Sequence, residues 1–74
     1  MPKLGIFSGR ELCAILGRFG FKEVRRRGSH IVMQKATFPS GTQTIPVPDH
    51  AELRIGTLQA IIRQSGIPRS EFER

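Results

Sequence analysis

The sequence predicts a two-layer α+β domain in the order helix, three antiparallel strands, helix. Two segments that space apolar side chains at the period of a helix flank a central region of short strand-like runs. A Gly-Ser pair at 28–29 and a Pro-Ser-Gly loop at 39–41 divide that region into three strands. The 74 residues suffice for a single domain, residues 1–74, with one small core. Two helices can then cover one face of the sheet and leave the other face open.

The first helix is expected to begin after Ser8 and to end before Gly20. Ser8 and Glu11 form the S-x-x-E pattern of a capping box, which satisfies two amides at a helix N-terminus. Apolar side chains then recur on one face, at Leu12, Ile15, Leu16 and Phe19. Gly20 supplies the left-handed residue that commonly follows a helix, and Phe21 can fold back on Leu16.

Residues 21–27 and 30–35 are strand candidates joined by Gly28-Ser29. Glycine at the first position of a two-residue loop is typical of a type II′ turn, which fixes the hairpin register. That register pairs Arg27 with His30, Arg26 with Ile31, Arg25 with Val32 and Val24 with Met33.

Cross-strand partners share a face of the sheet, so the register also predicts which side chains lie together. We expect a helix-facing side that carries Val24, Ile31 and Met33. We expect an open side that carries Arg25, Arg27, His30 and Gln34, with Val32 among them. Arg26 falls on the helix-facing side, where its head group can reach water at the edge.

The C-terminal half supplies the remaining elements. Residues 43–47 form a third strand candidate, which Pro46 and Pro48 restrict to a short or edge position. The second helix covers about residues 54–64 and ends at Gly66. Its apolar side carries Ile55, Leu58, Ile61 and Ile62. Residues 70–73 can form one further turn that docks Phe72.

Charge and composition narrow the classes of partner. The formal charge is +6 and the sequence pI is near 11.2, a balance that favours a polyanion. The five phenylalanines are the only aromatic residues, which gives weak support to a stacking platform for single-stranded bases. Cys13 is the single cysteine, so no internal disulfide can form, and a reducing compartment is indicated. No apolar run approaches a secretory signal or a membrane span, and we expect a cytoplasmic protein without a membrane partner.

The segment Arg25-Arg26-Arg27-Gly28-Ser29-His30 is the candidate site. RNA can be cut without a metal or cofactor because its 2′-hydroxyl is an internal nucleophile. Such cleavage needs a base and cations for the charge that builds on phosphorus. Imidazole is the side chain suited to that proton transfer near neutral pH, and neighbouring arginines favour its neutral form. The pattern indicates His30 as general base, whereas an exposed histidine without a task remains the alternative.

Other residues receive supporting roles. We expect Arg25 and Arg27 to bind phosphate, and Arg26 and Lys35 to contact RNA as well. Gly28 and Ser29 form the turn that positions the site. The general acid is unassigned, with Lys35, water and His50 as candidates. Two distant histidines without clustered carboxylates predict no metal site.

Four blocks of sequence occur together in a fixed order, at residues 8–12, 20–30, 45–50 and 56–67. This pattern resembles the HicA family of small toxin mRNA interferases, from Ser8 to about Phe72. The resemblance implies a fold like that of double-stranded-RNA-binding domains and a metal-independent endoribonuclease that acts on mRNA. It also implies neutralisation by a HicB-like antitoxin protein. The family's catalytic histidine falls in the Gly-Ser-His block, on His30.

Other functions remain open. A non-catalytic RNA-binding module of the same fold predicts that His30→Ala leaves function intact. A small interaction protein, whose basic face recognises an acidic protein, predicts no RNA affinity at physiological salt. DNA binding is the weakest reading, because both helices are committed to the core and no recognition helix stands out.

Overall fold

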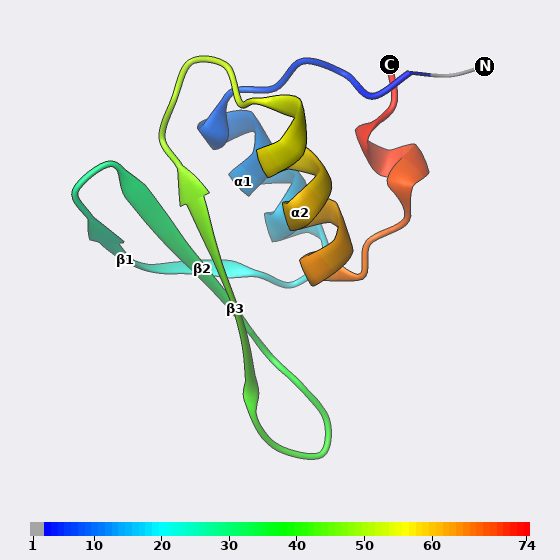
Figure 1. Cartoon of the computed structure of the whole chain (residues 1–74). Helices are drawn as coiled ribbons and strands as arrows, with labels where there is room; N and C mark the ends of the chain where they lie inside the picture. The colour runs from blue at the N-terminus through cyan, green and yellow to red at the C-terminus, as the bar shows by residue number, and fades with distance from the viewer. Residues whose placement is uncertain (1–2) are drawn as a thin grey trace.

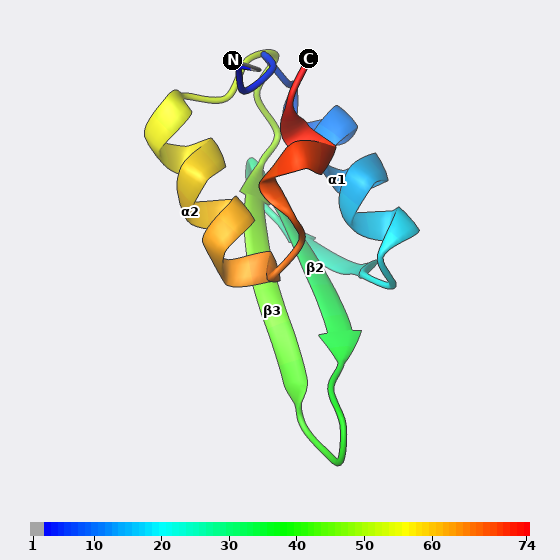
Figure 2. The same cartoon turned by 90° about the vertical axis from the view of Figure 1, so that its right-hand side faces the viewer.

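The elements lie in the expected order in the computed structural model, which describes residues 3–74. They are α1 (Gly9–Arg18), β1 (Lys22–Arg27), β2 (His30–Ala36), β3 (Thr42–Pro48), α2 (Ile55–Ser65) and the 3-10 turn η1 (Arg69–Phe72). The strands form one antiparallel sheet in the order β1-β2-β3. Both helices cover one face of that sheet (Figures 1 and 2), which confirms the predicted α+β fold. Met1 and Pro2, at the start of the segment read as lacking a secretory signal, lie outside the described residues.

Helix α1 begins and ends with the predicted local motifs. The Ser8 hydroxyl accepts a bond from the Glu11 amide at 3.0 Å, and the Glu11 carboxylate accepts one from the Ser8 amide at 2.9 Å. At the other end, the Phe21 amide donates to the Leu16 carbonyl at 3.1 Å. Gly20 has a φ of 98°, the left-handed conformation that this helix ending requires.

The β1–β2 hairpin has the predicted turn but not the whole predicted register. Gly28 has a φ of 58° while Ser29 keeps a negative φ, as a type II′ turn requires. The three arginines pair as expected, whereas the pairing of Val24 with Met33 is wrong. A β-bulge lies between residues 23 and 25, so Glu23 faces Met33 and Val24 has no partner. Val24 is 48% exposed and does not belong to the core.

The C-terminal half follows the prediction with one correction. Strand β3 lies at an edge of the sheet, one of the two alternatives that its prolines allow, and it is as long as β2. Helix α2 ends at Gly66, which has a φ of 72°. Ile55 is 57% exposed in the first turn of α2, so it is not part of the apolar side that Leu58 and Ile61 bury.

One core lies between the helices and the sheet. It takes side chains from every element except β1, and it also includes residues from the connecting segments: Phe7, Leu12, Leu16, Phe21, Ile31, Met33, Ile45, Val47, Leu53, Leu58, Ile61, Ile67 and Phe72. Turn η1 docks Phe72 as predicted, and its ring meets Phe7 edge to face at 6.3 Å between centroids. Among residues 3–74, no helix is long and apolar enough to cross a membrane.

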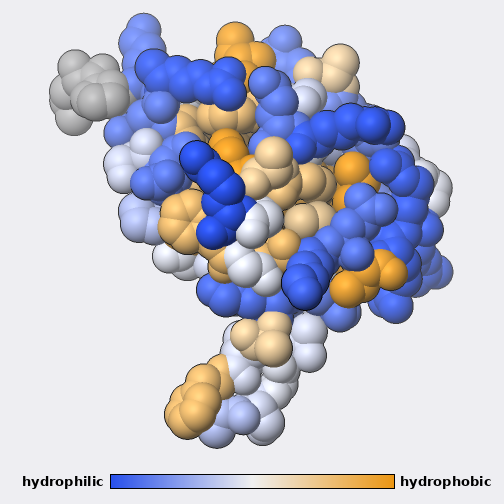
Figure 3. Space-filling model, turned by 180° about the vertical axis from the view of Figure 1, so that it is seen from behind, coloured by the Kyte–Doolittle hydropathy of each residue, from blue (hydrophilic) through white to orange (hydrophobic). Residues whose placement is uncertain are grey.

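The β2–β3 hairpin extends well beyond the helices. Its loop, residues 37–41, forms the far end of a narrow arm (Figures 1 and 3). The Thr37 amide donates to the Gly41 carbonyl at 3.1 Å and closes the loop. The sheet is therefore longer than the helical layer that covers it.

Candidate functional site

The face of the sheet opposite the helices, called the open face below, carries the candidate site. Successive strand residues point to opposite faces, and Ile31, Met33, Ile45 and Val47 mark the helix-facing side because they are buried in the core. The register then assigns the open face these side chains: Lys22, Arg25, Arg27, His30, Val32, Gln34, Thr42, Thr44, Pro46 and Pro48. Every basic residue that the hairpin register placed on the open side is found there.

His30 begins the central strand and is exposed. Its neighbours across the sheet are Arg27 of β1 and Pro48 of β3. The turn before it is also anchored, because the Ser29 carbonyl accepts a hydrogen bond from the Asp49 amide at 2.7 Å. The backbone of His30 is therefore held from both sides while its imidazole faces solvent.

Arg25 and Arg27 lie beside His30 on the open face. Both are exposed, and no ion pair among residues 3–74 involves either of them. Val32 lies between Arg25 and Pro46 and is only 7% exposed, although it is not part of the core between helices and sheet. The open face thus has a small apolar centre, with uncompensated cations on the β1 side of it.

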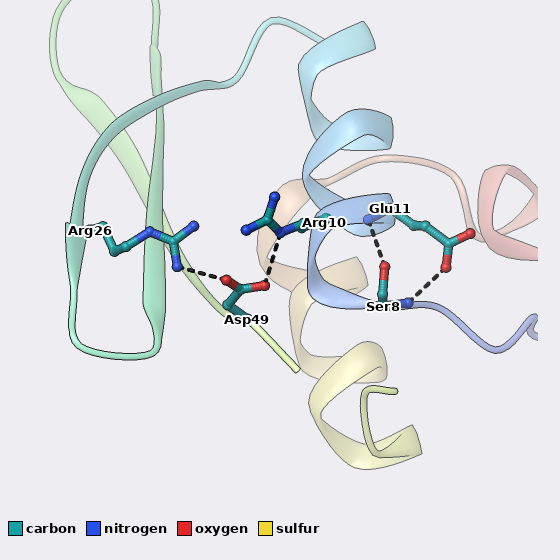
Figure 4. Close-up of polar contacts among 5 residues, drawn as sticks. All are labelled: Ser8, Arg10, Glu11, Arg26 and Asp49. Carbon is teal, nitrogen blue, oxygen red and sulfur yellow. Dashed lines mark hydrogen bonds and ion pairs between the residues drawn. The ribbon is translucent and has the colours of Figure 1, made fainter. Parts of the chain in front are cut away.

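Arg26 lies on the other side of the sheet and has a partner of its own. Its guanidinium donates to the Asp49 carboxylate at 2.7 Å, and Arg10 of α1 approaches the same carboxylate at 3.5 Å (Figure 4). The bond from Arg26 lowers the pKa of Asp49 below its ordinary value, and the same bond raises the pKa of Arg26. Arg26 was expected to contact RNA, but the structure does not bring it to His30. It ties the β1 edge to the loop after β3.

Asp49 is the residue that sequence reasoning missed. Its amide holds the turn before His30 and its carboxylate holds Arg26 and Arg10, so it joins the turn, the sheet edge and α1. Arg26 and Asp49 are 23 residues apart, and their contact depends on the pairing of β1 with β2 and of β2 with β3. No local pattern in the sequence signals such a contact.

Lys35 is also placed away from the site. It follows Ile31 and Met33 at intervals of two residues, so its side chain lies on the same helix-facing side, near the far end of β2. Its ammonium lies 5.7 Å from the centroid of the Phe21 ring. The sequence could have predicted this position, because residue 35 is an even number of residues from Ile31 and Met33 and therefore shares their face of the strand.

His50 lies near the His30 end of the sheet, two residues beyond Pro48. Its side chain is exposed, and its carbonyl accepts a hydrogen bond from the Gly9 amide at 2.9 Å. Gly9 permits this contact because a Cβ atom there would overlap the Pro48 carbonyl oxygen. The loop that carries Asp49 and His50 is thus fixed to the start of α1.

Two hollows of the surface lie in the helical layer, and neither is lined by His30. One is lined by Gln59, Ile62, Arg63 and Arg69, and the other by Phe7, Glu11, Ala14, Ile15, Arg18, Glu71 and Arg74. Among residues 3–74, no three His, Cys, Asp or Glu side chains are grouped to hold a metal ion. What the open face offers chemically is an exposed imidazole beside two guanidinium groups.

In a comparison with protein families, a model of the family described as the HicA toxin of bacterial toxin–antitoxin systems matches residues 9–67. The matched segment contains α1, the three strands and α2, and it includes His30, Arg25, Arg27 and Asp49. A search of curated proteins found no match.

Proposed function

Since this chain belongs to the HicA family of toxins from bacterial toxin–antitoxin systems, we propose that it is an endoribonuclease that cleaves mRNA. His30 is the general base, and Arg25 and Arg27 bind the phosphate that reacts. The observation that carries the proposal is the placement of these three side chains on one exposed sheet face. The protein acts in the cytoplasm, where mRNA is translated.

The proposed reaction is an attack by the RNA on itself. His30 takes the proton of a 2′-hydroxyl, and the 2′-oxygen then forms a bond to the adjacent phosphorus. The bond from phosphorus to the 5′-oxygen breaks, and that oxygen takes a proton from water or from His50. Arg25 and Arg27 stabilise the added negative charge on the phosphorane. The products are a 2′,3′-cyclic phosphate and a 5′-hydroxyl.

The site has the form that a long, flexible substrate needs. An open sheet face gives no enclosed pocket for a small molecule, but a single strand can lie along it. Cations on that face bind phosphate without regard to sequence, so cleavage with little sequence selectivity is expected. Asp49 holds the backbone of the site in place, because its amide donates to the Ser29 carbonyl in the turn before His30.

The test is cleavage of a long mRNA in excess EDTA by the wild type and by His30→Ala, Arg25→Ala/Arg27→Ala and Arg63→Ala. Arg63 is an exposed cation of α2 on the opposite layer, so its variant controls for loss of charge. We expect His30→Ala to lose cleavage, the double variant to lose affinity, and Arg63→Ala to resemble the wild type. Products that carry 5′-phosphates would exclude the 2′-hydroxyl mechanism.

A second function has an observation in its favour. Neither of the two hollows described above is lined by His30, and among residues 3–74 no ion pair joins His30 to a side chain that could protonate the leaving oxygen. A non-catalytic RNA-binding module of the same fold fits such a site. That function requires the His30→Ala protein to bind RNA as the wild type does and both proteins to leave the RNA intact.

The partner proposed for this toxin is a HicB-like antitoxin protein. A protein that covers the open face masks His30 and both arginines at once. Because the exposed cations of that face have no carboxylate partner among residues 3–74, an acidic surface is the complementary one. Inhibition by the antitoxin should therefore weaken when Arg25 and Arg27 are replaced.

A further inference from the structure

One aromatic side chain stands apart from the other four. Phe7, Phe21 and Phe72 are buried and Phe19 is half-buried, whereas Phe38 is 97% exposed. It lies in the loop at the end of the β2–β3 arm, away from the helices (Figures 1 and 3). A phenyl ring left in water forgoes about 1.5–3 kcal/mol of burial, and this free energy is available to a partner that covers the ring.

The arm around Phe38 is neutral. Residues 36–46 contain no Lys, Arg, Asp or Glu, in a chain where 24% of residues are charged. A neutral arm offers no attraction to an acidic protein or to an anionic membrane surface. The flat face of a base is a neutral, polarisable partner, and every base has one.

The open face connects this arm to the cations beside His30. From His30 to Ala36, β2 advances about 20 Å at the usual rise of a strand. Between these points the open face first presents the apolar side chains Val32 and Pro46, with Arg25 beside them on β1. It then presents Gln34, whose amide donates to the Thr44 hydroxyl at 3.2 Å, with Lys22 beside it on β1. One RNA strand laid along β2 would meet guanidinium groups at one end and a phenyl ring at the other.

We propose that Phe38 is a stacking site for an unpaired base of single-stranded RNA, held about 20 Å or more from the reacting phosphate. This inference rests on the proposed function and adds a second anchor to it. Single-strand binders combine cations that follow the backbone with aromatic rings on which bases stack, over about 4–16 nucleotides per site. The span from His30 to the arm suits a strand of that length.

The absence of tryptophan from the sequence gives a direct probe. Phe38→Trp is prepared in a His30→Ala parent, so that RNA is not cut and all indole fluorescence comes from position 38. The ligand is a 12-nucleotide unstructured RNA with a fluorescein at one end, and affinity is measured by anisotropy. We expect RNA to quench the indole. We expect Phe38→Ala and Phe38→Leu to weaken binding about 5- to 150-fold, the range that stacking of one base gives.

A trinucleotide is the matched control, because it cannot reach from Arg27 and His30 to the arm. Its affinity should be the same with Phe38 and with Ala at position 38. Equal affinity of the parent and Phe38→Ala for the 12-mer, with no indole quenching, would overturn the inference and leave the proposed function standing. Full affinity of Phe38→Leu would show an apolar contact rather than stacking, and would also overturn it. No RNA binding by the parent or by the wild type would instead overturn the proposed function. A melting temperature equal to the parent's confirms that the variants are folded.

Discussion

Replacement of Gly9 tests how the loop beneath the site is held. Gly9 is the first residue of α1, and its amide donates to the His50 carbonyl. A Cβ atom there would overlap the Pro48 carbonyl oxygen and lie 3.0 Å from the Pro48 carbonyl carbon and 3.1 Å from Asp49 Cα. All three are backbone atoms, so no side chain can turn away to make room. Gly9→Ala must therefore separate α1 from the loop.

The cost can be worked out from three contributions. Overpacking of a tight contact costs about 1–3 kcal/mol. Loss of the hydrogen bond from Gly9 to His50 costs about 0.5–1.5 kcal/mol. Alanine returns up to about 1 kcal/mol through its better helix propensity, and less at the first helical position. The free energy of unfolding should fall by about 2 kcal/mol, which lowers the melting temperature of a domain this small by about 8–16 °C.

Gly17 provides the control within the same helix. A Cβ atom at Gly17 would meet nothing within 4 Å, so Gly17→Ala should raise stability by about 0.5–1 kcal/mol. Urea and thermal unfolding followed by circular dichroism measure both variants. A Gly9→Ala protein that melts with the wild type, or a Gly17→Ala protein that loses as much as Gly9→Ala, would refute the packing argument.

Three further predictions concern single side chains. The carboxyl pKa of Asp49 is held below 3.8, mainly by the bond from Arg26, so its stabilising effect is present above that value and disappears as pH falls through the folded pKa. The urea midpoints of the wild type and Asp49→Asn should therefore differ near pH 6 and converge progressively as the pH falls below 3.8. Burial raises the pKa of Cys13 from 9.0 to about 11. At pH 8 a thiol reagent should react about tenfold more slowly than in the urea-unfolded chain, since a ~100-fold smaller thiolate fraction is partly offset by stronger nucleophilicity. Val24→Ala should cost less than about 0.5 kcal/mol in urea unfolding, against about 2–5 kcal/mol for Met33→Ala.

Each of these predictions has a contrary outcome. A constant difference between the wild type and Asp49→Asn across the acid range would show that the carboxylate charge contributes nothing to stability. Equal labelling rates of Cys13 in the folded and unfolded chains would show an accessible thiol. A cost for Val24→Ala equal to that for Met33→Ala would restore Val24 to the core and contradict the bulge.

Local signals account for most of the elements that the sequence predicted correctly. The Ser8–Glu11 pair, the ending at Gly20 and the turn at Gly28 each depend on a few consecutive residues, and each is found as expected. The family resemblance, drawn from four short blocks, is confirmed by the match over residues 9–67. The cap, the helix ending and the turn form through contacts within about five residues, so the residues that make them stand close together in the sequence.

Features that depend on distant contacts were not predicted. The bulge at Val24 depends on how the start of β1, the end away from the turn, pairs with β2, and alternation alone does not show an extra residue. The partners of Asp49 come together only when α1, β1 and β3 are in place. Whether His30 acts as a base, and whether Arg25 and Arg27 bind phosphate, stay predictions that the cleavage assay decides.

The distribution of ion pairs has a consequence for how quickly a substrate arrives. Arg18 of α1 faces the Glu71 carboxylate, and Arg10 shares the Asp49 carboxylate with Arg26, so part of the field of these cations is cancelled. The strand positions of the open face include Lys22, Arg25 and Arg27 but no acid. An approaching polyanion therefore feels an uncompensated attraction toward this face, which can raise an association rate about 10- to 1,000-fold at low ionic strength. Under the proposed function, an RNA strand would be turned toward His30 during diffusion, and encounters would be productive more often than random collisions allow.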